Sequence, residues 1–183
     1  MKRTPRRKTV VLQLCSLMAC LMCLSGITDP RPAKVTDYLT KYRYLAVELN
    51  KQAQIPIPVI IAVAGLESDW GTSLLAQQSN NHFGLKAQNW IGQVHCQGSP
   101  EYIQERGFQI IESCFRKYPY IRDSYMDFGR YLSTDSRYYW LFYYHPTDYA
   151  SWATGLQQSG YATDPDYSSK IIRLIQDYKL EEI

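Results

Sequence analysis

Glu67 occupies the position in this sequence that most suggests catalysis. Residues 59–66 are apolar on every side of a helix and contain nothing ionisable, and Glu67 follows them directly. A negative charge at a helix C-terminus is disfavoured by the helix dipole, and burial beside Trp70 would disfavour it further, so both effects raise the carboxyl pKa. A carboxyl that is protonated near neutral pH can act as the general acid in glycosidic cleavage. The alternative is that Glu67 only marks where the helix reaches solvent.

Glycosidic cleavage commonly uses a second carboxylate, which activates water or stabilises positive charge on the sugar. Glu101, Glu105 and Glu112 lie in the region 80–118, which could fold over Glu67. The spacing does not choose between them, and each could equally be a solvated surface group.

Five ordered blocks of sequence resemble glycoside hydrolase family 73. These are the peptidoglycan β-N-acetylglucosaminidases, which include the muramidase-like domain of flagellar rod-assembly proteins. The resemblance covers nearly all of residues 35–181 and implies a mainly α, lysozyme-like α+β domain with a small β-hairpin arm. It also implies a hydrolase that cleaves the β-1,4 bond after N-acetylglucosamine in peptidoglycan strands. The blocks are 64–73 (AGLESDWGTS), 80–86 (NNHFGLK), 90–92 (WIG), 114–118 (CFRKY) and 160–167 (GYATDPDY).

The resemblance assigns catalytic roles to particular residues. Glu67 matches the family's general acid. Counted from residues 90–92, Glu101 falls where a number of members place their second carboxylate, and Glu105 is the fallback. Tyr161 matches a tyrosine that faces the substrate cleft, although it could instead staple the turn at Gly160 to the core.

Five further residues of these blocks are expected to contact substrate. Phe83 and Trp90 could instead be packing residues, and Asn81 could simply belong to a tight turn, since asparagine tolerates left-handed backbone. The expected substrate-binding residues are Trp70, Asn81, Phe83, Gly84 and Trp90.

The elements that must position these residues follow from apolar periodicity and from breaking residues. The pattern predicts an export leader over 1–30 and one mainly α domain over 31–183, with a loop and small β-hairpin within 80–118. Gly71 is expected to end the apolar helix that carries Glu67, and Thr72 to cap the next one. Helices are expected over 35–54, 58–67, 72–78, 123–132, 137–144, 147–158 and 165–178, the last with Asp164 as its cap.

The first thirty residues have the order of an export signal, with basic residues at 2–8, a mostly apolar run at 9–24 and small or polar residues after it. The run is shorter than the roughly 20 residues of a comfortable membrane span. Residues 17–20 resemble a lipoprotein box in which Cys20 would be acylated. Cleavage near Gly26 and an uncleaved anchor are the alternatives. All three place the domain outside the cytoplasm, in the periplasm or cell envelope.

Cys96 and Cys114 are the two cysteines beyond the leader. An even pair in an exported domain predicts a disulfide, with two free thiols as the alternative. They also resemble a pair in exported Bacteroides-type members of the family, although there the first cysteine often occupies the place that Ala87 has here. Together with His82 and His95 they lack a compact metal-ligand spacing, and we expect neither metal nor organic cofactor.

Charge excludes a nucleic-acid partner. The whole chain has a net charge of +3, but its first thirty residues hold five basic residues and one acid. The remainder has 15 basic and 16 acidic residues, a net charge of −1, and no basic run. We therefore expect peptidoglycan strands as the partner and membrane contact only through the leader; the oligomeric state stays open. The rival functions are a lytic transglycosylase and a catalytically silent peptidoglycan-binding module.

Overall fold

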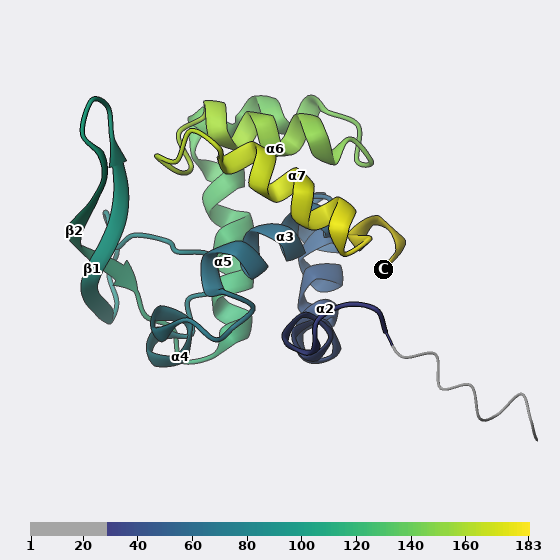
Figure 1. Ribbon diagram of the computed structural model, residues 1–183, viewed down its shortest axis with the longest axis horizontal. Helices are drawn as coiled ribbons and strands as arrows, with labels where there is room; N and C mark the ends of the chain where they lie inside the picture. The colour runs from purple at the N-terminus through teal and green to yellow at the C-terminus, as the bar shows by residue number, and fades with distance from the viewer. Residues whose placement is uncertain (1–28) are drawn as a thin grey trace, which may run out of the picture. The chain divides into compact units, whose positions relative to one another are not determined.

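The computed structural model describes residues 29–183. Contacts divide the chain into two units, Met1–Pro32 and Ala33–Ile183, and the second unit carries every element described below (Figure 1). The expected leader features, including acylation of Cys20, lie outside the described residues. Over residues 29–183, no helix has both the length and the apolar character needed to cross a membrane.

The second unit is mainly helical with one two-stranded sheet, as the sequence predicts. The elements, in chain order, are α2 (Ala33–Ala53), α3 (Ile57–Ser68), α4 (Leu74–Ser79), β1 (Val94–Ile103), β2 (Gly107–Arg116), α5 (Ile121–Thr134), the 3₁₀ helix η1 (Ser136–Tyr143), α6 (Tyr149–Gln158), α7 (Tyr167–Asp177) and the 3₁₀ turn η2 (Leu180–Glu182).

Helix α3 forms the centre of the core. Its residues from Val59 to Gly65 are all buried, and the helix contacts α2, α6, α7 and η2. A helix that is apolar on every side can be stable only when other elements surround it. The fully apolar run therefore fixes α3 in the middle of the domain, and its last turn carries Glu67 with it.

The end of α3 differs from the expectation and corrects the role of Trp70. The helix ends at Ser68, and both Asp69 and Trp70 adopt left-handed backbone, with φ of 46° and 57°. This turn sends the Trp70 ring back into the core, edge-on to Tyr38, where only 6% of the residue is exposed. Trp70 is thus a core residue in this structure and does not present its ring to a ligand.

The hairpin arm is built from β1 and β2, which pair antiparallel and project to one side of the helices in Figure 1. Cys96 lies opposite Cys114 in the register, and the two form a disulfide across the arm. At the tip, Gly107 has a φ of 68° and allows the reversal between the strands.

Three smaller differences concern η1, α4 and α7. The segment expected as a helix over 137–144 is the 3₁₀ helix η1. The short helix after α3 is capped by Ser73, whose side chain accepts a hydrogen bond from the Ala76 amide, and not by Thr72. Helix α7 begins at Tyr167, later than predicted, because Asp164 accepts a hydrogen bond from the Asp166 amide in a turn that precedes the helix.

Candidate active site

The Glu67 carboxyl lies in the last turn of α3 and meets residues from the far end of the chain. Tyr167, the first residue of α7, donates a hydrogen bond from its phenol to Glu67 Oε1 at 3.0 Å. Contact between α3 and α7 is what brings the two together. The carboxyl is therefore held by the packing of the core and not by a loop.

Gly84 covers the other oxygen of the same carboxyl. A β-carbon at position 84 would lie 2.8 Å from Glu67 Oε2, and Gly84 itself has a φ of 62°. Both the close approach and the left-handed backbone favour glycine there, because a β-carbon would displace the Glu67 carboxyl. The expected site residue Gly84 thus adjoins Glu67 through its backbone.

These surroundings raise the pKa of Glu67 to about 7. The largest cause is burial, which penalises the charged form; the Tyr167 hydrogen bond opposes it, and the negative charges of Glu101 and Asp164 add to it. The carboxyl therefore holds its proton close to neutrality, as a general acid must. The sequence predicts that the pKa of Glu67 is raised. The contributions of Glu101 and Asp164 were not expected, and the Trp70 ring, which was expected beside the carboxyl, packs edge-on to Tyr38 in the core.

Glu101 approaches this site from β1. Its Oε1 pairs with Lys86 Nζ at 2.5 Å, and its Oε2 accepts a hydrogen bond from the Thr163 hydroxyl at 3.0 Å. The Thr163 oxygen also accepts from the Tyr102 amide at 3.1 Å. The loop between α6 and α7 is thereby tied to the arm at the residue that was expected to be the second carboxylate.

The two other candidate carboxylates face solvent. Glu105 lies at the arm tip with left-handed backbone, and Glu112 is exposed on β2. The side chain of Glu101, by contrast, is only 15% exposed. Among the three, the structure brings Glu101 into the surroundings of Glu67.

Tyr161 lies beside the Glu67–Tyr167 pair. Its ring centroid is 5.8 Å from that of Tyr167, and its hydroxyl donates to the Phe83 carbonyl at 2.7 Å. Burial raises the pKa of Tyr161 well above its ordinary value, and the charge of Glu67 raises it further. Tyr161 is therefore a neutral donor that fixes the backbone just before Gly84.

Asn81 and Phe83 also shape this segment, and the expectation that their side chains contact substrate is corrected. Both are almost fully buried. Asn81 donates to the carbonyls of Leu85 and Arg116 and accepts from the amides of Phe83 and Leu85. The Phe83 ring stacks on Phe128 in the core. The two residues hold the loop that places Gly84 against Glu67.

Trp90 lies at the base of the arm, partly exposed. Its indole N–H donates to the Gln93 carbonyl at 3.0 Å, and the Arg116 guanidinium lies 5.0 Å from its ring centroid. These contacts join the Trp90 ring to the base of the arm. The Trp90 ring is partly exposed, and its contact with substrate remains a prediction.

Sequence reasoning missed Tyr167, Thr163 and Lys86 as individual site residues. All three lie within the family blocks 80–86 and 160–167, which could have indicated them. Nothing in the local sequence indicates which side chain each of them contacts. In residues 29–183, no group of three or more His, Cys, Asp and Glu side chains could hold a metal ion.

Residues 43–180 match the family model described as mannosyl-glycoprotein endo-β-N-acetylglucosaminidase. The chain belongs to the glucosaminidase family. Glu67, Gly84, Glu101 and Tyr161 all lie within the matched residues.

Two curated relatives are similar to this chain over most of its length. The chain is 36% identical to the exo-glucosaminidase LytG of Bacillus subtilis over 165 residues, which is 82% of this chain and 56% of that protein. It is 31% identical to the peptidoglycan hydrolase FlgJ of Escherichia coli over 159 residues, 82% of this chain and 49% of FlgJ. The chain thus spans about half the length of these curated relatives.

The fold is shared with solved structures. The catalytic domain of the Listeria monocytogenes autolysin Auto matches with a TM-score of 0.68 and 29% identity, covering 99% of both chains. The glycoside hydrolase domain of Salmonella typhimurium FlgJ matches with a TM-score of 0.60 and 28% identity, covering 81% of this chain and 90% of that one. The lysozyme-like fold class predicted from the sequence is confirmed.

Proposed function

We propose that this protein hydrolyses the β-1,4 bond on the reducing side of N-acetylglucosamine within peptidoglycan strands, with Glu67 as general acid. The observation that carries the proposal is the Glu67 carboxyl, whose pKa is raised to about 7 in a setting built from α3, α7 and the Gly84 segment. Relatives named as a glucosaminidase and as peptidoglycan hydrolases support the substrate class.

In the proposed reaction, protonated Glu67 donates its proton to the leaving glycosidic oxygen as the C1–O bond breaks. Glu101 then takes a proton from a water molecule that attacks C1 from the opposite face, which inverts the anomeric configuration. Lys86 and Thr163 support this role because they orient both oxygens of Glu101. Tyr167 and Tyr161 orient the acid and the loop against it.

The alternative second step uses the substrate itself. The 2-acetamido group of N-acetylglucosamine can attack C1 as an internal nucleophile, which gives retention of configuration. NMR observation of the first-formed anomer distinguishes the two routes, and a retained anomer would exclude Glu101 as the base.

The deciding experiment is digestion of purified sacculi followed by mass spectrometry of the released muropeptides. We expect hydrated products that end in N-acetylglucosamine, and at least about 100-fold less release with Glu67→Gln. Products with anhydro-muramic ends, which lack one water, would identify a lytic transglycosylase. Release no greater than background by both wild type and Glu67→Gln would leave only a binding module.

Cleavage inside strands, as opposed to removal of terminal residues, is part of the proposal. The family description names an endo-acting enzyme, whereas LytG is named as an exo-glucosaminidase. Long products early in the digestion support endo cleavage. Action outside the cytoplasm, in the periplasm or envelope, follows from the substrate, and fractionation of cells with detection of a lipid-modified Cys20 tests that location.

A further inference from the structure

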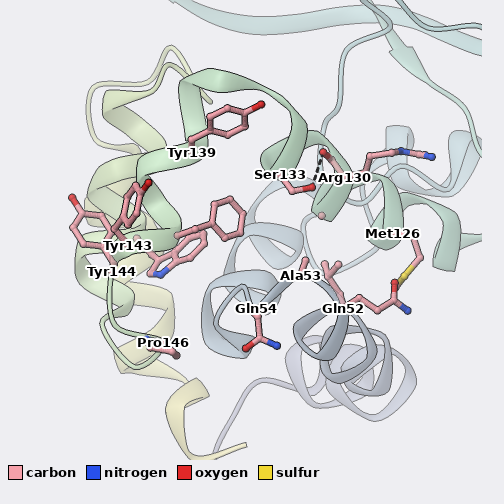
Figure 2. A pocket seen from close by; sticks show the side chains of 14 residues that line it. Gln52, Ala53, Gln54, Met126, Arg130, Ser133, Tyr139, Tyr143, Tyr144 and Pro146 are labelled. Atoms are coloured by element: carbon pink, nitrogen blue, oxygen red, sulfur yellow. Dashed lines mark hydrogen bonds between the residues drawn. The ribbon is translucent and has the colours of Figure 1, made fainter.

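A concave site lies away from Glu67. It is a hollow of about 870 Å³ between the end of α2, one face of α5, η1 and the start of α6. Figure 2 shows Tyr139, Tyr143 and Tyr144 gathered on one side of the hollow, with Gln52 and Gln54 across from them. Nothing in the proposed reaction uses these residues.

Helix α5 separates the hollow from the candidate active site. Asp127 and Tyr131 on one face of the helix contact Arg116, and Tyr131 also lies against Tyr161. Met126 and Ser133 line the hollow from a different face of the same helix. Two faces of one helix point in different directions, so a ligand in the hollow does not contact Glu67.

The aromatic wall of the hollow is open to solvent. Tyr143 is 89% exposed and Tyr139 is 52% exposed, although both are large rings in a folded domain. Tyrosine rings combine a broad apolar face with a polar edge, and they lose little side-chain entropy on binding. Flat, exposed rings of this kind are suited to stack against the C–H faces of a sugar.

The polar groups of the hollow are mostly uncharged. Gln52 and Gln54 supply amide groups, and among the described lining residues only Arg130 carries a charge. Arg130 is already paired with Asp127 at 2.7 Å. The hollow therefore favours a neutral ligand with hydrogen-bonding groups over an acidic one.

One buried donor in the wall lacks an acceptor. Trp152 lines the hollow and is 1% exposed, and its indole N–H finds no hydrogen-bond partner within the described part of the chain. The Trp152 ring packs nearly perpendicular to the ring of Phe142, which also lines the hollow. The N–H itself is closed to solvent, so the Trp152 indole reports on a ligand in the hollow through its surroundings and does not contact the ligand.

We propose that this hollow is a second glycan-binding site, which takes a neutral N-acetylated sugar chain with its sugar faces on Tyr139 and Tyr143 and its acetamido groups against the Gln52 and Gln54 amides. The inference rests on the proposed function, because the same peptidoglycan strand supplies such sugars. A strand bound at two points has a higher effective concentration at Glu67. The second site therefore increases the rate of hydrolysis of the polymer and leaves that of short fragments unchanged.

The test is an NMR titration of the Glu67→Gln protein with a tetramer of β-1,4-linked N-acetylglucosamine. The Trp152 indole signal, assigned by Trp152→Phe, is the local readout. We expect that signal to shift, and Tyr143→Ala to raise the Kd measured from it about tenfold. Tyr143→Phe keeps the ring and should bind like the parent, and Tyr44→Ala removes a tyrosine that is 63% exposed elsewhere and should have no effect.

Activity provides the second readout, in proteins with Glu67 intact. Tyr143→Ala should raise KM for sacculi several-fold and leave turnover of short soluble fragments unchanged. An unshifted Trp152 signal, or a shift that Tyr143→Ala leaves intact, overturns the second site. A shift with a free stem peptide and none with the tetramer overturns the glycan assignment. If wild type fails to digest sacculi while Trp152 responds as expected, the proposed function fails and the glycan site stands.

Discussion

Tyr167 and Glu67 lie 100 residues apart in the sequence, and the Tyr167 hydroxyl oxygen lies 3.0 Å from Glu67 Oε1 in the structure. The phenol donates to the carboxylate and so stabilises the charged form, while burial of the same carboxyl favours the neutral form. The pKa of about 7 is the result of these opposing effects. The acidity of the site is therefore adjustable by a single hydroxyl group.

The first prediction concerns the pH dependence of Tyr167→Phe. In wild type, kcat/KM should fall as pH rises through about 7, because Glu67 loses the proton that it must donate. Without the Tyr167 hydroxyl the charged form is less stable, so the pKa rises and the falling limb moves up by about one pH unit. pH profiles of the two proteins measure this, with Tyr44→Phe as the control. A limb that stays in place or moves down contradicts the assigned role.

The second prediction is that Glu67→Gln stabilises the protein at alkaline pH. The pKa of Glu67 is higher in the folded state than in the unfolded state. Between about pH 4.5 and about pH 7 the folded state therefore binds more protons than the unfolded state, and the free energy of unfolding falls as pH rises through this range. Glutamine carries no such cost. We expect about 1 to 3 kcal/mol of added stability at pH 8 and almost none at pH 4. Thermal unfolding at both pH values measures the difference, and an equal change at the two would contradict a titrating carboxyl.

The third prediction compares two glycines with the same backbone strain. Gly84→Ala and Gly107→Ala each place a β-carbon on left-handed backbone, and each should cost about 1 kcal/mol of stability. At position 84 the new carbon also meets Glu67 Oε2, whereas at position 107 nothing lies within 4 Å. We expect Gly84→Ala to lose about 100-fold in kcat and Gly107→Ala to keep near wild-type activity. Similar activities for the two variants would show that contact with Gly84 does not place the carboxyl.

The fourth prediction separates the candidate second carboxylates. Glu101→Gln should reduce kcat about 100-fold or more, because it removes a base held by Lys86 and Thr163. Glu105→Gln and Glu112→Gln change exposed residues of the same arm and serve as matched controls. Hydrolysis rates on sacculi measure all three. A larger loss with Glu105→Gln would transfer the role to that residue.

The fifth prediction concerns the disulfide of the arm. Cys96 and Cys114 are 18 residues apart, and closing a loop of this size stabilises the folded chain by about 3 kcal/mol on the chain-entropy model. Reduction should expose the arm to trypsin at Arg106, near its tip, before the helical core unfolds. A time course of proteolysis with and without reductant tests this. The Cys96→Ser, Cys114→Ser double variant should behave like the reduced protein, and identical cleavage rates would contradict it.

The parts of the fold that the sequence predicts are those with a local pattern. Apolar periodicity identifies α2, and the fully apolar run identifies α3 as the central helix. Glycines and short apolar runs within residues 80–118 locate the hairpin. The turn after α3 is different, because Asp69 and Trp70 themselves adopt left-handed backbone before Gly71 is reached, so the direction of the Trp70 ring was not predictable.

The candidate site likewise contains residues that a local pattern predicts and residues that only tertiary packing reveals. Glu67 is conspicuous in the sequence because it follows the apolar run directly. Tyr167 and Thr163 reach the site through the packing of α7 and the α6–α7 loop, and no local pattern indicates which side chain they meet. Asn81 and Phe83 belong to a recognisable block, but only tertiary contacts reveal that their side chains face inward.

The contact between Gly84 and Glu67 also gives a criterion for sorting related sequences. A relative that has glutamate at the position of Glu67 but any larger residue at the position of Gly84 could not hold the carboxyl in the same place. Such a chain would be expected to bind cell-wall polymer without cutting it. The pair, and not the glutamate alone, is therefore the feature to check before a homologue is counted among the active enzymes.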